Sequence, residues 1–130
     1  MVAHGRGLLI TGASGSGKSS LALQLMALGA GLVADDRVVL EARDGVLTGN
    51  APDAIAGLIE ARGMGILRAE PHGPAAIVAV VDCDRTEAER LPPRRFAEVL
   101  GIHLPILHKG ESAAFPAALM QYLKSGFQDE

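Results

Sequence analysis

The sequence predicts an α/β fold, a single domain whose sheet is mixed and partly antiparallel. The apolar run "GLLI" leads into a glycine-rich loop, "GASGSGKSS", which is followed by the helix pattern "LALQLMALG". A second apolar run, "AIVAVV", predicts a buried partner strand. The segment "RDG" predicts a tight turn between two β-prone runs. Strands joined by so short a turn must be antiparallel, because a parallel pair needs a long crossover.

The first half of the chain begins with a strand and a helix. Residues 5–12 predict a short buried strand that ends in a glycine turn. Residues 18–29 are apolar on nearly all sides of a helix, so this helix should pack on the sheet and end at Gly29. Residues 31–50 predict strand, turn and strand, and 52–67 a short helix or turn followed by a strand.

The second half contains the clearest strand, at residues 75–84. The polar, proline-broken stretch 85–95 predicts an exposed connection, and 103–107 predicts one more strand. A closing helix is expected within 111–126, with Ser112 as its N-cap and Gly126 as its stop.

Composition narrows the class of protein. The 130 residues suit one domain, taken as 1–130, and 48% of them are hydrophobic. The net charge of −3 and the 3% aromatic content argue against a nucleic-acid or anionic-membrane partner. The chain has one cysteine and neither a long apolar run nor a signal-peptide pattern, so we expect a cytoplasmic protein with Cys83 in its core.

The glycine-rich loop fits the phosphate-loop pattern G-x-x-x-x-G-K-S, with a strand pattern before it and a helix pattern after it. Its glycines let successive N–H groups face one anion, and the following helix directs its positive dipole end there. Lys18 can reach the β- and γ-phosphates, and the Ser19 hydroxyl can bind Mg²⁺. The sequence therefore predicts binding of a nucleoside triphosphate such as ATP with Mg²⁺. The predicted binding residues are Gly12, Ala13, Ser14, Gly15, Ser16, Gly17, Lys18, Ser19 and Ser20.

Acidic residues in three segments compete for the rest of the site. Asp82 follows an apolar strand, as the usual second metal carboxylate does. Asp35 and Asp36 end another apolar run, and adjacent residues on a strand point to opposite faces, so one can face a metal and the other a substrate hydroxyl. Glu60 and Arg62 should share one face of an extended segment, where a carboxylate and a guanidinium suit Mg²⁺ and triphosphate. A solvated strand end and a surface ion pair are the alternatives.

Three segments taken together, "GASGSGKSS", "LVADDRV" and "LIEARGMGIL", resemble the catalytic domain of bacterial HPr kinase/phosphorylase. The resemblance covers roughly residues 5–82 and includes the signature E-x-R-G-x-G-[IL]. It implies a fold like that of phosphoenolpyruvate carboxykinase around the phosphate loop. It also implies ATP-dependent phosphorylation of a seryl hydroxyl on the phosphocarrier HPr, and in many members the reverse phosphorolysis.

The resemblance also implies roles for individual residues. Asp35 matches the general base and Lys18 the phosphate-binding lysine, with Arg62 as the third catalytic candidate. Ser19, Asp36 and Glu60 match the surroundings of Mg²⁺, and Gly63 and Gly65 belong to the signature. Family members form hexamers, so a homo-oligomer is expected.

The chain departs from the family pattern in several places. It resembles short alphaproteobacterial members without the N-terminal domain, and His4 lies too close to Gly12 to match the family's catalytic histidine. Ser20 stands where many members have glutamate. Where long members have a basic loop tied to phosphorolysis, His108 and Lys109 are the only basic candidates, and no arginine stands there. The resemblance therefore supports the kinase reaction more strongly than the reverse reaction or the hexamer.

Two other functions stay open at this point. The chain can be a nucleotide-binding regulatory module that acts through a partner, such as a sensor kinase or another phosphotransferase-system protein, with little catalysis. It can also be a small-molecule kinase in which Asp82 holds the metal.

Overall fold

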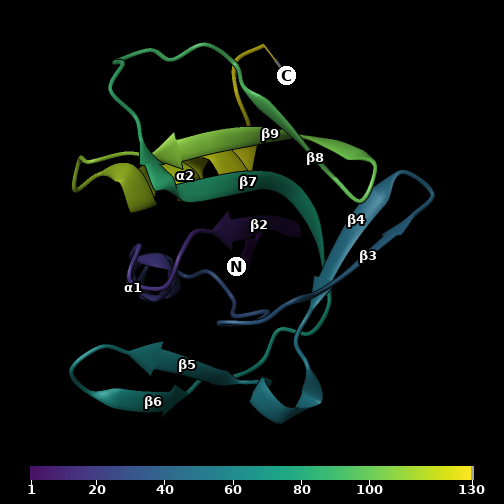
Figure 1. The fold of residues 1–130 in the computed structure, drawn as a ribbon, viewed down its shortest axis with the longest axis vertical. Coiled ribbons are helices and arrows are strands. Elements are labelled where there is room, and N and C mark those ends of the chain that lie inside the picture. The colour runs from purple at the N-terminus through teal and green to yellow at the C-terminus, as the bar shows by residue number, and fades with distance from the viewer. Residues whose placement is uncertain (130) are drawn as a thin grey trace.

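The computed structural model describes residues 1–129, in which a mixed sheet is packed against helices (Figure 1). The helices are α1 (Lys18–Ala27) and α2 (Phe115–Ser125), with one 3₁₀ turn, η1 (Asp53–Ile55). The strands are β1 (Val2–Ala3), β2 (Arg6–Thr11), β3 (Val39–Arg43), β4 (Val46–Asn50), β5 (Leu58–Ala61), β6 (Gly65–Arg68), β7 (Ala75–Thr86), β8 (Phe96–Val99) and β9 (Ile102–Lys109).

The long strand β7 organises the sheet. It pairs in parallel with β2 and β9 and antiparallel with β4, so the prediction of a mixed sheet is confirmed. Its first residues face β4, with Ile77 opposite Leu47, and its second half faces β9, with Val80 opposite Ile106. β7 curves between these two neighbours (Figure 1). The carboxyl ends of β2, β7 and β9 consequently meet at one edge, where the phosphate loop begins.

The core lies mainly between the sheet and its helices. Successive residues of β7 point to opposite faces, and Ala79, Val81 and Cys83 join the cluster that includes Leu25 of α1 and Leu123 of α2. Cys83 is buried, as the sequence predicts. A second, smaller cluster comprises Leu47, Ile77, Val80 and Leu104.

The β5–β6 hairpin is paired separately from the main sheet. Ile59 of β5 is 1% exposed and belongs to the same core cluster as Leu21 and Leu25 of α1. Helix α1 thus lies between the sheet and this hairpin (Figure 1). This packing brings the residues that follow the phosphate loop close to the signature segment.

Two expectations fail locally. β8 is missing from the predicted elements, although it pairs antiparallel with β9 and its Phe96 ring stacks on His103 at 4.8 Å. The N-cap of α2 is Ala114 and not Ser112, whose hydroxyl accepts a hydrogen bond from the Ala114 N–H at 3.1 Å just before the helix. Gly126 does end α2. Across residues 1–129, no helix is both long and apolar enough to cross a bilayer.

Candidate functional site

The phosphate loop connects β2 to α1 and is held open by its glycines. Gly15 and Gly17 have φ angles of 84° and 96°, a region that side chains with a Cβ rarely occupy. The Ser16 N–H donates to the Ala13 carbonyl at 3.0 Å, which curls the loop. Lys18 begins α1, and its ammonium donates to the Gly12 carbonyl at 2.6 Å. The lysine therefore lies against the loop and not free in solvent.

Asp35 joins the phosphate loop to the β5–β6 hairpin. One of its carboxylate oxygens accepts a hydrogen bond from the Ser19 hydroxyl at 2.9 Å. The other accepts from the backbone N–H of Glu60, also at 2.9 Å. Both oxygens of this half-buried side chain are therefore directed at structural partners.

Asp36 lies in a tight turn and not on a strand, so the prediction of a strand through both aspartates is wrong. The Arg37 N–H donates to the Asp35 carbonyl at 2.5 Å, and Asp36 between them has a φ of 56°. Such a three-residue turn with positive φ is a strained form. A strand would have placed the two carboxylates on opposite faces, whereas this turn leaves Asp36 exposed at the phosphate loop.

A polar pocket of about 180 Å³ lies between the phosphate loop and the signature segment. Asp36, Glu60 and Arg62 line it from one side. The loop and the start of α1 line the other side with Ser14, Gly15, Gly17, Lys18, Ser19 and Ser20. Sites that enclose whole drug-sized ligands usually measure about 300–1,000 Å³. This pocket therefore suits a phosphate chain with a cation better than a complete nucleotide.

A second, more apolar pocket of about 80 Å³ adjoins the first. Its walls come from β2, from the segment 33–38 and from Ile77 of β7. Lys18 and Asp36 line both pockets. These two side chains therefore lie where the polar and apolar pockets meet.

The donor set in the polar pocket fits Mg²⁺. Ser19, Asp36 and Glu60 all line it, which brings the predicted metal residues together. Within the described residues, no group of three or more His, Cys, Asp or Glu side chains is arranged to hold a metal ion by itself. Mg²⁺ usually takes one or two carboxylates and completes its shell with water and substrate phosphates. The side chains present match that requirement.

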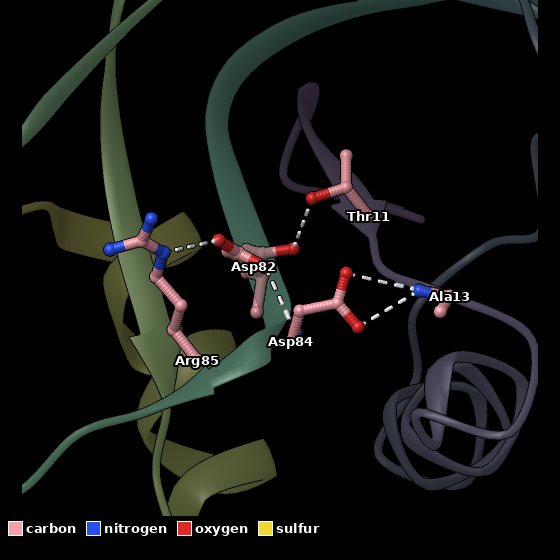
Figure 2. Close-up of polar contacts among 6 residues, drawn as sticks. Thr11, Ala13, Asp82, Asp84 and Arg85 are labelled. Carbon is pink, nitrogen blue, oxygen red and sulfur yellow. Dashed lines mark hydrogen bonds and ion pairs between the residues drawn. The ribbon is translucent and has the colours of Figure 1, made fainter.

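Asp82, the competing metal carboxylate, faces away from the phosphate loop. One of its oxygens accepts from the Asp84 N–H at 2.9 Å, and the other lies 3.6 Å from the Arg85 side chain. Asp84 instead reaches the loop, where both of its oxygens accept from the Ala13 N–H, at 2.9 and 3.1 Å (Figure 2). The sequence reasoning missed Asp84, because regular strand alternation would place it on the same face as Asp82, whereas the register shift after Asp82 turns it toward the loop.

Some of the predicted binding residues lie outside the polar pocket. Gly12, Ala13 and Ser16 belong to the loop but do not line the polar pocket. The Ala13 N–H is directed to Asp84, and the Ser16 hydroxyl is buried without a hydrogen-bond partner. Lys109, at the end of β9, donates from its ammonium to the Ser16 carbonyl at 3.1 Å. A residue 93 positions away from Ser16 in sequence is thus part of the loop's surroundings.

The chain is similar to proteins of one family. A family model described as "HPr Serine kinase C-terminal domain" matches residues 1–80. An HPr kinase/phosphorylase from Clostridium kluyveri is 54% identical over 67 residues, which make up 52% of this chain and 22% of that protein. One from Bordetella pertussis is 53% identical over 64 residues, 48% of this chain and 21% of that protein. The matched region thus spans less than a quarter of these relatives.

A solved structure, described as the Hpr(Ser) kinase/phosphatase from Coxiella burnetii, is similar over nearly the whole chain. The match has a TM-score of 0.75 and 25% sequence identity, and it covers 92% of this chain and 86% of that one. Since the family model covers more than half of the residues, the chain belongs to the HPr Serine kinase C-terminal domain family.

Proposed function

We propose that this domain is a protein-serine kinase that transfers the γ-phosphoryl group of ATP, bound with Mg²⁺, to a seryl hydroxyl of an HPr-like phosphocarrier. Family membership and the donors gathered around the polar pocket support this proposal. The names of the relatives supply the acceptor. A homo-oligomer and a cytoplasmic location, both expected from the sequence, remain predictions.

One observation carries the proposal, namely the position of Lys18 and Asp36 at the junction of the two pockets. The polar pocket has the size and the donors for a phosphate chain. The apolar pocket offers a separate approach for the residues around an acceptor serine. A phosphoryl group that passes between the two would travel beside a lysine ammonium and an aspartate carboxylate, which are the groups such a transfer needs.

The transfer is a balanced displacement. The acceptor serine oxygen forms a bond to the γ-phosphorus while the bond from that phosphorus to the β–γ bridging oxygen breaks and ADP leaves. The serine proton passes to the Asp36 carboxylate. Lys18 and Arg62 offset the negative charge on the transferring group, because both line the polar pocket. Bound Mg²⁺ would supply further charge neutralisation on the phosphate oxygens, next to Ser19 and Glu60.

The hydrogen bonds of Asp35 favour a different role for it from the one that the family resemblance implies. We propose Asp36 as the proton acceptor, in place of the metal-binding role that the resemblance implies for it, and Asp35 as a positioning residue. Asp35 lines only the apolar pocket, and its two oxygens already accept from Ser19 and from the Glu60 N–H, whereas the exposed Asp36 lines both pockets. It would orient the Ser19 hydroxyl and hold the signature segment against the loop.

The test is phosphorylation of a purified HPr phosphocarrier by wild-type protein and by Asp36→Asn. Loss of a general base lowers rates by about 10²- to 10⁴-fold. Asp44→Asn is the matched control, because Asp44 also has a positive φ of 53° but lies at the turn between β3 and β4. Equal rates in wild type and Asp36→Asn would refute the assignment of the base.

The same experiment separates the regulatory alternative. Wild-type protein that binds MgATP tightly but phosphorylates no phosphocarrier would favour a nucleotide-dependent module that acts through a partner.

A further inference from the structure

Two side chains hold the phosphate loop from outside its pocket. Asp84 on β7 accepts the Ala13 N–H with both carboxylate oxygens, at 2.9 and 3.1 Å. Lys109 on β9 donates to the Ser16 carbonyl at 3.1 Å. Neither Asp84 nor Lys109 lines the polar pocket. The two contacts therefore hold the first and second halves of the loop without occupying the phosphate position.

An irregularity in the sheet directs these side chains at the loop. Asp82 pairs with His108 and Thr86 pairs with Lys109, so three residues of β7 are left over between consecutive residues of β9. Such bulges redirect side chains and are frequent next to active sites. Asp84 is one of the three residues, and Lys109 is the last residue of β9. Figure 2 shows the Asp84 carboxylate turned toward Ala13.

Gly17 leaves the space that Lys109 needs. A Cβ at position 17 would lie only 2.7 Å from the Lys109 ammonium. The absence of a side chain at Gly17 thus serves both the curl of the loop and this contact. Asp84 is also held in place, because its own N–H donates to Asp82 at 2.9 Å. Both contacts are therefore supported by neighbouring structure.

We propose that Asp84 and Lys109 form a loop brace that preorganises the empty phosphate loop for nucleotide binding. Glycine loses more conformational freedom on ordering than any other residue, and this loop contains Gly12, Gly15 and Gly17. A loop that is ordered before the ligand arrives binds it more tightly, because binding then loses no free energy to ordering the loop. Asp84 and Lys109 are positioning residues, and the inference rests on the nucleotide binding proposed above.

For the removal of Asp84, the brace predicts a change in nucleotide affinity opposite to the change that charge alone predicts. Removing a carboxylate near an anion site should strengthen anion binding if charge alone matters. If Asp84 orders the loop, its removal weakens binding instead. Lys109→Met weakens binding in either case, so Asp84→Ala is the decisive variant.

The experiment is calorimetric titration of MgATP, and separately of tripolyphosphate, into wild-type protein, Asp84→Ala and Lys109→Met. Loss of a charge-assisted hydrogen bond to the loop should raise Kd by about tenfold in each variant. Asp84→Asn and Lys109→Arg, which keep an acceptor and a donor, should restore much of the affinity. Glu98→Ala and Lys124→Met are controls of the same charge change on β8 and α2.

Thermal unfolding without nucleotide distinguishes positioning from general stability. Since the Asp84 contact is solvent-exposed, the melting temperature should stay close to that of the wild type while Kd rises. Asp84→Ala that binds MgATP as tightly as wild type, or more tightly, would overturn the brace alone. Wild-type protein that binds no MgATP would overturn the proposed function together with the brace. Because no acceptor protein is present, failure to phosphorylate HPr does not affect this readout.

Discussion

The two neighbouring aspartates should respond in opposite ways to the same isosteric change. Asp35→Asn replaces a carboxylate that accepts two hydrogen bonds, one from the partly buried Ser19 hydroxyl and one from the exposed Glu60 N–H. An amide has one acceptor oxygen, so with that oxygen on the Glu60 N–H its NH₂ group faces the Ser19 hydroxyl, which must then accept and not donate. Asp36→Asn, in contrast, changes a side chain that no hydrogen bond or ion pair holds within residues 1–129.

The expected changes in stability follow from these contacts. Asp35→Asn should lose about 1–2 kcal/mol of stability, because two hydrogen bonds to a charged carboxylate are replaced by weaker neutral ones. In a chain of this length that corresponds to a fall in melting temperature of roughly 3–8 °C. Asp36→Asn should change stability by less than about 0.5 kcal/mol, because asparagine tolerates a positive φ as aspartate does.

The assay combines thermal unfolding with MgATP titration and a phosphoryl-transfer rate. Asp35→Asn should lose stability and bind MgATP more weakly, since Ser19 loses its orienting partner. Asp36→Asn should keep both properties and lose transfer. A melting temperature unchanged in Asp35→Asn, or lowered equally in both variants, would refute the assignment of separate roles.

Three further outcomes follow from burial and charge. Ile59 is 1% exposed and attaches the β5–β6 hairpin to α1, so Ile59→Ala should lower the free energy of unfolding, measured by chemical denaturation, by about 2–5 kcal/mol. Ile66→Ala, at a 63%-exposed position on the same hairpin, should lower it by less than about 0.5 kcal/mol, and equal losses would contradict the packing. Burial raises the pKa of the Cys83 thiol and covers it, so a thiol reagent at neutral pH should label native protein far more slowly than unfolded protein. The hydrogen bond from Arg95 holds the pKa of the Glu87 carboxyl below its ordinary value, so the pair stabilises the fold above the ordinary carboxyl pKa and this contribution is lost as the pH falls through the lowered value. Melting curves of wild type and Glu87→Gln should accordingly differ at neutral pH and converge in acid, and a constant difference would disprove the linkage.

Local patterns were sufficient for the elements that depend on local physics. The apolar run of β7, the helix pattern of α1 and the turn at residues 44–45 each combine a sequence period with a fixed stop. Asp44 and Gly45 both have positive φ angles, as a two-residue hairpin turn with an "RDG" sequence requires. The mixed sheet followed from that turn, because it excluded a parallel pair.

The features that the sequence did not predict depend on contacts between segments far apart in the chain. The strand expected through Asp35 is a turn because its carboxylate is drawn to Ser19 and to the Glu60 N–H. β8 was hidden by the polar run before it, since its pairing with β9 supplies the strand and not its own composition. Asp84 and Lys109 reach the phosphate loop through an offset between β7 and β9, which no local period reveals.

Intact mass spectrometry of an HPr phosphocarrier after incubation with this protein and MgATP is the decisive test of the proposed phosphoryl transfer. We expect a gain of about 80 Da, the mass of one phosphoryl group, with wild-type protein and with Asp44→Asn. We expect no gain with Asp36→Asn, although this variant should still bind MgATP. No gain with nucleotide-bound wild-type protein, or an undiminished gain with Asp36→Asn, would contradict this proposal.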